Sequence, residues 1–142
     1  MTHRDDVTNP DDERPRPASV PAGLTVQLFR GRVVPGRSDT VDEWMTMLND
    51  RLTESVATLN RERMGIEIVF RQRDGEDEYL YWVIVRGDGE SVETSQHQLD
   101  IDHRAYDALC RQPGWQTATS ELLLLPDRVR GAVLEACCIA EV

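Results

Sequence analysis

Residues 78–87, EYLYWVIVRG, form the segment that most constrains the fold. Successive side chains of a strand point to opposite faces, so one face here carries Tyr79, Tyr81, Val83 and Val85, and the other carries Leu80, Trp82 and Ile84. A strand with large apolar residues on both faces lies inside a sheet that is covered on both sides. The chain must therefore supply neighbouring strands and two covering layers.

Three further segments have strand character. Residues 24–34 and 66–72 alternate apolar and polar residues, and residues 117–126, TATSELLLLP, are read as the fourth strand. The Asp74-Gly75 pair lies between residues 66–72 and 78–87, which predicts an antiparallel hairpin.

Helices are expected between these strands. An apolar stripe from Val41 to Leu59 predicts one long helix that starts near Ser38 and ends at Gly65. Residues 87–94, GDGESVET, are read as a turn and the start of a second helix, which continues through residues 93–110. Residues 127–138 form a terminal helix after Pro126.

The resulting order, β-α-β-β-α-β plus a tail helix, is that of the ferredoxin-like α+β fold, with a four-stranded antiparallel sheet and both main helices on one face. The other face would expose much apolar surface, which predicts a homodimer that packs sheet against sheet. Residues 1–22 are acidic and rich in proline, and are expected to be a disordered leader. Residues 23–142 then form a single domain.

The composition of the chain excludes several classes of binding partner. The 142-residue chain has a net charge of −10 and no basic run, which argues against nucleic acid and anionic membranes. Its apolar stretches are shorter than the roughly 20 residues that cross a bilayer, and the amino terminus lacks a secretory signal. A soluble cytoplasmic protein is expected. Cys110, Cys137 and Cys138 form no CxxC pair, so free thiols are expected.

The segment 93–110 holds the first candidate site. On an ideal helix His103 falls in the apolar stripe, and Asp100 and Asp107 flank it and could each accept a hydrogen bond from its ring. His103 is then either a satisfied core histidine or an acid–base group that faces a cleft. His97 and His103 lack the spacing of a helical zinc motif, so no metal is expected.

Glu67 interrupts an apolar strand, on the face opposite Ile66 and Ile68. Its carboxylate either faces solvent or is buried with a raised pKa and poised for proton transfer. Packing in the core or in a dimer interface is the favoured role of four aromatic residues, which are also candidates for substrate contact: Trp44, Tyr81, Trp82 and Trp115.

Four blocks of the chain, VDEWMTMLNDR, IEIVFRQRDGEDEYLYW, SQHQLDIDHRAYDALC and LLLLPDRVRGAV, resemble a bacterial family of uncharacterised domains, domain-of-unknown-function family 6176, over about residues 24–134. The Ser-x-His-Pro-Ile-Asp-x-x-His block of that family is present here as Ser95, His97, Gln98, Leu99, Asp100 and His103, with Gln98 in place of the proline.

That family in turn resembles the dimeric α/β-barrel superfamily, which implies a homodimer with a pocket between helices and sheet. The superfamily includes cofactor-free monooxygenases, mutarotases, isomerases, cyclases and haem-degrading enzymes, so the resemblance selects no reaction. Our leading hypothesis is a cofactor-independent small-molecule enzyme or binder in which His103 and Asp100 transfer a proton and His97, Glu67 or Trp115 contacts the substrate. The alternative is a non-catalytic homodimer with a structural or regulatory role.

Overall fold

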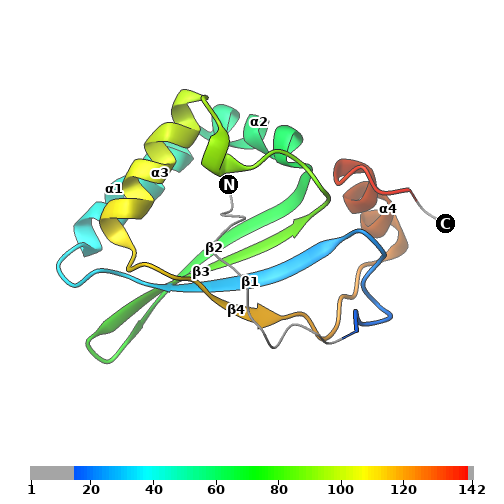
Figure 1. Ribbon diagram of the computed structural model, residues 1–142, viewed down its shortest axis with the longest axis horizontal. Helices are drawn as coiled ribbons and strands as arrows, with labels where there is room; N and C mark the ends of the chain where they lie inside the picture. Colours follow the sequence, from blue (N-terminus) through cyan, green and yellow to red (C-terminus); the bar gives the residue numbers. More distant parts are fainter. Residues whose placement is uncertain (1–14, 141–142) are drawn as a thin grey trace.

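A computed structural model describes residues 15–140 and contains one four-stranded antiparallel sheet in the order β2-β3-β1-β4 (Figure 1). The strands are β1 (Thr25–Arg32), β2 (Met64–Asp74), β3 (Asp77–Arg86) and β4 (Gln116–Thr119). Strand β3 lies between two neighbours, as its two-faced apolar pattern predicts. The β2–β3 hairpin is confirmed: Asp74 pairs with Asp77, and Gly75 takes the positive φ of 61° that the tight turn requires.

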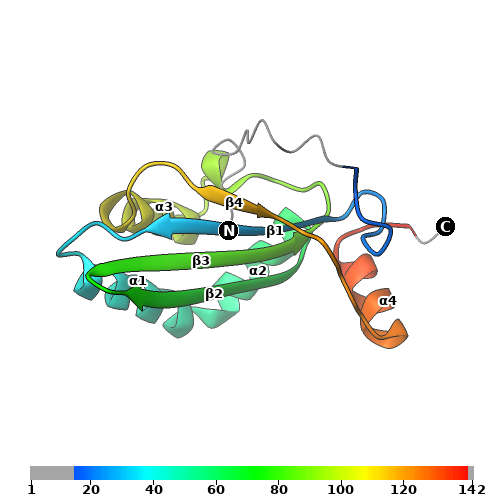
Figure 2. The same ribbon diagram turned by 90° about the horizontal axis from the view of Figure 1, so that it is seen from below.

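Helices cover both faces of the sheet unequally. Helices α1 (Ser38–Asp50), α2 (Leu52–Glu62) and α3 (Gln98–Cys110) lie over one face, together with the short 3-10 helix η1 (Val92–Thr94). Helix α4 (Asp127–Ala136) packs at one end of the opposite face. Figure 2 shows that opposite face in front, with α1 and α2 behind it and α4 at the end of the strands. The protein is therefore a mixed α/β domain with an open sheet.

The core under α1–α3 is built around β3. Leu80, Trp82 and Ile84 pack there with Trp44 of α1 and Cys110 of α3, all at most 2% exposed. Trp82 pairs with Phe29 across β1 and with Val69 across β2, so these three side chains share the covered face. The even-numbered side of β3 thus forms the centre of the larger core.

The second core lies under α4. It contains Val85 of β3, Val133 and Leu134 of α4, and Val20 and Leu24 from the start of the described chain. Residues 15–22, which we expected to belong to a disordered leader, instead form turns that place Val20 in this core. The rest of the expected leader, residues 1–14, lies outside the described residues.

The first helix differs from its prediction. The helix is interrupted at Arg51 (φ −101°, ψ 43°), so α1 and α2 are separate helices. The break turns α2 about its axis, because Leu52 and Val56 of the expected stripe are 59% and 53% exposed whereas Thr58 and Glu62 are buried. The predicted stripe was therefore wrong at Leu52 and Val56, whereas Leu59 packs against the core as predicted.

Other boundaries also shift. Helix α2 ends at Glu62 and is capped by Arg63, which takes the left-handed conformation, and Gly65 lies within β2. Helix α3 starts only at Gln98, since residues 92–94 form η1. Strand β4 has four residues, shorter than predicted, because residues 121–125 pack Leu123 and Leu125 against the α4 core instead of pairing with the sheet.

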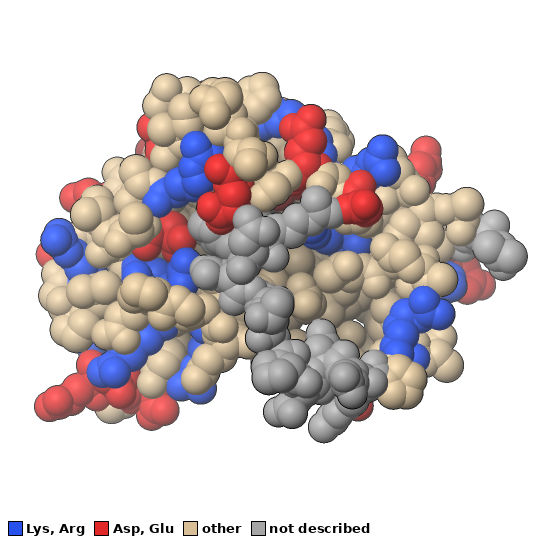
Figure 3. Space-filling model, viewed as in Figure 1, with Lys and Arg blue, Asp and Glu red and all other residues tan. Residues whose placement is uncertain are grey.

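Part of the open face remains uncovered. Ile68 and Phe70 of β2 are 42% and 55% exposed there. On the side shown in Figure 3, arginine and acidic side chains are interspersed over the described surface. No helix between residues 15 and 140 is both long enough and apolar enough to cross a bilayer.

Candidate functional site

His103 lies at the centre of the layer between the helices and the sheet. Its ring is fully buried and contacts the rings of Trp44 and Trp82 at centroid distances of 5.2 and 5.4 Å. Its Nδ1 accepts a hydrogen bond from Trp44 Nε1 (3.1 Å). A neutral ring that accepts at Nδ1 carries its proton on Nε2. His103 is therefore held between two indoles and joins α1, α3 and β3.

Asp100 lies one turn before His103 on α3 and connects that helix to α2. Its Oδ2 accepts hydrogen bonds from Ser95 Oγ (2.5 Å) and Arg61 Nη2 (3.3 Å). The backbone N–H of His97 in turn donates to Ser95 Oγ (3.2 Å). The carboxylate also sits in the first turn of α3, where the positive end of the helix favours negative charge. The segment before α3 thus fixes Asp100 in position.

The expected link from His103 to a flanking aspartate takes a different form. Asp107 accepts two hydrogen bonds from Arg111, at 2.7 and 2.9 Å, and Asp100 is bound by Ser95 and Arg61. The His103 Nδ1 is bound by an indole donor and not by a carboxylate. Asp107 therefore pairs with an arginine, and Asp100 pairs with an arginine and a serine.

Glu62 is the strongest acid–base candidate, and the sequence reasoning missed it. It ends α2, and its side chain is 3% exposed. Burial raises the pKa of Glu62 to about 6, and the nearby carboxyl groups of Glu67 and Asp100 add to that rise. A carboxyl group in this range can give or take a proton near neutral pH.

Glu67 approaches the same place from the sheet. It pairs with Ile84 across β2–β3, and Ile84 belongs to the core under the helices, so Glu67 points to the helical side. The side chain is half-buried. Of the two readings of Glu67, the structure supports a position between helices and sheet. Glu62, Glu67 and Asp100, from three different elements, form what we call the carboxyl cluster.

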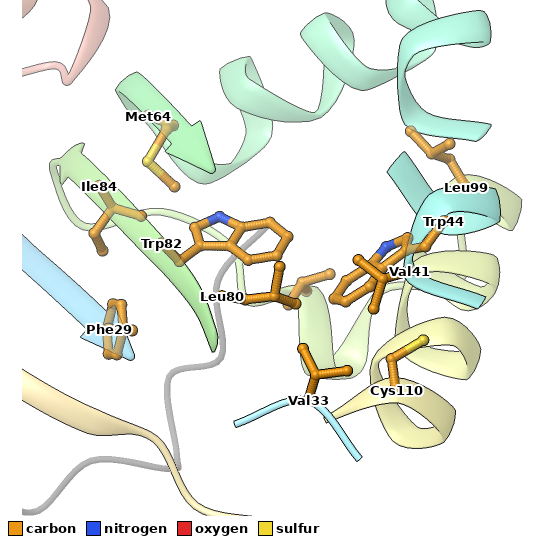
Figure 4. Packing of buried hydrophobic residues seen from close by; sticks show 11 residues of the cluster. Phe29, Val33, Val41, Trp44, Met64, Leu80, Trp82, Ile84, Leu99 and Cys110 are labelled. Atoms are coloured by element: carbon orange, nitrogen blue, oxygen red, sulfur yellow. The ribbon is translucent and has the colours of Figure 1, made fainter. Parts of the chain in front are cut away.

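The tryptophans form a connected wall beside His103. Trp82 contacts Trp44 at 5.5 Å and Trp115 at 6.2 Å between ring centroids. Figure 4 shows Trp44 and Trp82 side by side in the core. Trp115 is half-buried, packs on Phe29, and carries the guanidinium of Arg111 at 4.1 Å over its ring. Trp44, Trp82 and Trp115 thus gather at one place.

Two candidates lie elsewhere. Tyr81 is on the opposite face of β3, where its hydroxyl donates to Gln72 Oε1 (3.0 Å). His97 is exposed at the N-cap of α3. It contributes to the site through its backbone N–H, which donates to Ser95 Oγ. Within the described chain, no three His, Cys, Asp or Glu side chains are grouped to hold a metal ion.

The signal for Glu62 was present in the sequence but concealed by the helix break. Glu62 follows Leu59 by three residues, so it continues the stripe that we assigned to the buried face. A carboxylate that continues a buried apolar stripe indicates a functional group. The rotation of α2, which exposes Leu52 and Val56, could not be read from the stripe itself.

The fold and the site define a class: a mixed α/β domain with a four-stranded antiparallel sheet and buried carboxyl groups between the sheet and one helical layer. Within that class the chain belongs to the family of unknown function DUF6176, whose model matches residues 24–131. No curated protein and no solved structure matches the chain.

Proposed function

We propose that the protein is a cofactor-independent enzyme or binder for a small molecule, with a ferredoxin-like fold, and that it acts as a cytoplasmic homodimer. The element order β1-α1/α2-β2-β3-α3-β4 and the strand order β2-β3-β1-β4 support a ferredoxin-like arrangement. The ligand lies between α2, α3 and the sheet, beside the carboxyl cluster.

The observation that carries this proposal is Glu62. A carboxyl group that is 3% exposed, has a pKa of about 6, and lies near two other carboxyl groups is suited to general acid–base catalysis. Glu62 takes the proton and returns it, as an isomerase, mutarotase or cyclase requires. Asp100 and Glu67 bind the substrate, and Trp115 lines the pocket.

His103 has a supporting role in this proposal. It is fully enclosed by Trp44 and Trp82, and it shares α3 with Asp100. It fixes the orientation of α3 against α1 and β3, and so the position of Asp100. His97, at the exposed start of α3, contacts substrate from the rim.

Proton transfer is tested by solvent exchange. The protein is incubated in D2O with a panel of hydroxy-carbonyl compounds, and NMR follows deuterium incorporation next to the carbonyl group. Glu62→Gln keeps the shape of the side chain and should slow exchange at least ~100-fold. The control Glu90→Gln removes an exposed carboxyl group and should leave exchange unchanged. Equal rates in Glu62→Gln and the wild type would contradict the role of Glu62.

A second candidate function, a non-catalytic homodimeric interaction module, is favoured by the uncovered part of the open face. Exposed apolar side chains on a sheet are typical of interfaces, and Ile68 and Phe70 lie together on β2. Sedimentation tests the dimer: the double variant Ile68→Ser/Phe70→Ser should become monomeric. The control Leu52→Ser/Val56→Ser changes two equally exposed residues on α2 and should leave the dimer intact. A wild-type monomer at micromolar concentration would contradict it.

A further inference from the structure

Helix α4 and the start of β2 border an open groove on the surface of the domain. Its volume is about 490 Å³, and most of its exposed lining is apolar. Helix α4 packs on the opposite face of the sheet from α1–α3 (Figure 2), so the groove is separate from the carboxyl cluster and from the proposed acid–base chemistry. It is lined by Gly65 of β2, by Pro126, and by a set of α4 residues: Arg128, Val129, Ala132, Val133 and Ala136.

The groove is hollow because the side chains along it are small. Arg128, Ala132 and Ala136 are spaced by four residues, so they form one line along α4. Gly65 has to be small, since an added Cβ would lie 2.9 Å from Cys137 Sγ. Ala132 and Ala136, in contrast, are exposed, so packing within the described chain does not require small side chains there. The two alanines leave room that another molecule can fill.

One end of the groove is positively charged. Arg128 lies in the first turn of α4, and among the described residues its guanidinium has neither an ion pair nor a hydrogen bond. The positive end of the helix dipole lies at the same place, and no described side chain caps the first N–H groups of α4. Asp127 is in the same turn but does not line the groove. The groove therefore joins an apolar floor to an unpaired cation.

The geometry points to a medium-chain fatty acid, an aliphatic carboxylate, as the occupant of the groove. Its carboxylate lies beside Arg128 and the start of α4, and its alkyl chain lies along Ala132 and Ala136 over Gly65. The helix rises about 12 Å from residue 128 to residue 136, which is the length of an extended chain of about eight to ten carbons. Burial of the alkyl chain supplies affinity, and the guanidinium selects the acid over an alcohol or an ammonium compound.

Calorimetric titration of the full chain with ligands of one chain length tests this inference. Octanoate, 1-octanol and octyltrimethylammonium share the alkyl chain and differ in the charge of the head group. We expect octanoate to bind about fivefold more tightly than 1-octanol, because it adds a partly exposed ion pair, and the cation to bind more weakly than both. Hexanoate should bind about fourfold more weakly than octanoate, because each half-buried methylene group that it lacks contributes about twofold to the affinity.

Variants at the groove locate the site. Ala132→Leu and Ala136→Leu fill the groove, and each should weaken octanoate binding at least about tenfold. Gly131→Leu adds the same side chain outside the groove, where no atom is within 4 Å of an added Cβ, and should leave binding unchanged. Arg128→Gln should weaken octanoate binding about fivefold and leave 1-octanol binding unchanged, whereas Arg37→Gln, which removes an exposed arginine elsewhere, should change neither. Either of the two groove-filling variants that keeps the thermal unfolding midpoint of the wild type suffices for this test.

Three results would overturn the inference. Equal binding of octanoate and octyltrimethylammonium would show adsorption to apolar surface without a role for Arg128. Octanoate affinity that is unchanged in both Ala132→Leu and Ala136→Leu would place the fatty acid elsewhere on the molecule. A wild-type dimer that becomes monomeric in Ala132→Leu, with unchanged octanoate binding, would assign the groove to a second copy of the chain.

Discussion

The layer formed by α1, α2 and α3 buries polar and charged groups with its apolar core, whereas the cluster under α4 is built only from apolar side chains. The first layer encloses His103, Asp100, Glu62 and Thr58. The buried members of the second are Val20, Leu24, Val85, Val133, Leu134 and Cys137. Both layers cover the same sheet, so the sheet does not impose the difference.

Buried polar groups are costly unless they are paired, and they add little stability that apolar residues could not supply. The α4 layer shows that this chain can cover a sheet without them. Their concentration under α1–α3 is what the proposed role in binding or chemistry would require. Variants in each layer test whether the two layers differ in this way.

The largest effect is expected for Trp44→Ala in the polar layer. The substitution removes a fully buried indole and leaves His103 Nδ1 without its donor. We expect a loss of about 4 kcal/mol in the free energy of unfolding, measured by urea denaturation. Trp44→Phe keeps most of the buried area and should lose only about 1.5 kcal/mol. Equal losses in the two variants would show that the indole N–H is the main contribution and packing the minor one.

The α4 layer is tested through Gly87→Ala. A Cβ at Gly87 would lie 2.1 Å from the carbonyl oxygen of Cys137, so the end of α4 must move. We expect a loss of about 3 kcal/mol. Hydrogen exchange should show lost protection in α4 while α1 and α3 stay protected.

Gly131→Ala is the matched control for that variant. Gly131 lies within α4, and no atom is within 4 Å of the position of an added Cβ. Alanine should therefore stabilise the helix by up to about 1 kcal/mol. A loss of protection throughout the chain in Gly87→Ala would show that the two layers unfold as one unit.

The sequence predicted the parts of the fold that depend on local patterns. The two-faced apolar run of β3 placed it inside the sheet, and Asp74-Gly75 defined the hairpin. The length of β4 was not predictable in this way. Residues 121–125 end in four consecutive leucines, of which Leu123 and Leu125 pack against the α4 core, and an apolar run of this length does not say which layer it faces.

Only the part of the site that depends on a local pattern was predicted. The block around Asp100 and His103 was found because both fall near the stripe of one uninterrupted helix. Glu62 was missed because the break at Arg51 contains neither proline nor glycine, so no local signal marks it. The packing of α2 against the sheet, a tertiary effect, determines which face of α2 is buried.

The two layers should also differ in their response to pH. The folded protein raises the pKa of Glu62 from 4.5 to about 6, so it binds more protons than the unfolded chain between these values. Stability from this group is therefore highest below pH 4.5 and falls by about 2 kcal/mol as pH rises through 6. Glu62→Gln has no such group.

Urea denaturation of the wild type and Glu62→Gln from pH 4 to pH 7.5 measures this contribution. The variant should gain about 2 kcal/mol relative to the wild type over that range. Leu134→Ala, in the α4 layer, should show the same pH dependence as the wild type. A constant difference between Glu62→Gln and the wild type would mean that the pKa of Glu62 is the same in the folded and unfolded states.

The smallest effect is expected where the polar layer is joined to η1 and the start of α3. Ser95→Ala removes the hydrogen bond from Ser95 Oγ to Asp100 Oδ2 and the one from the His97 N–H to Ser95 Oγ, and should cost about 1 kcal/mol. Ser91→Ala removes a similar bond, from the Glu93 N–H to Ser91 Oγ, and should cost about the same, so single variants cannot separate local capping from support of the carboxyl cluster.

A double-mutant cycle with Asp100→Asn separates them. Ser95→Ala and Asp100→Asn should couple by about 1 kcal/mol, because both remove one interaction. Ser91→Ala and Asp100→Asn should be additive. Coupling in both pairs would mean that the segment from η1 to α3 responds to substitution as one unit. Ser95 would then have no specific role in supporting Asp100, and this part of the contrast between the two layers would be rejected.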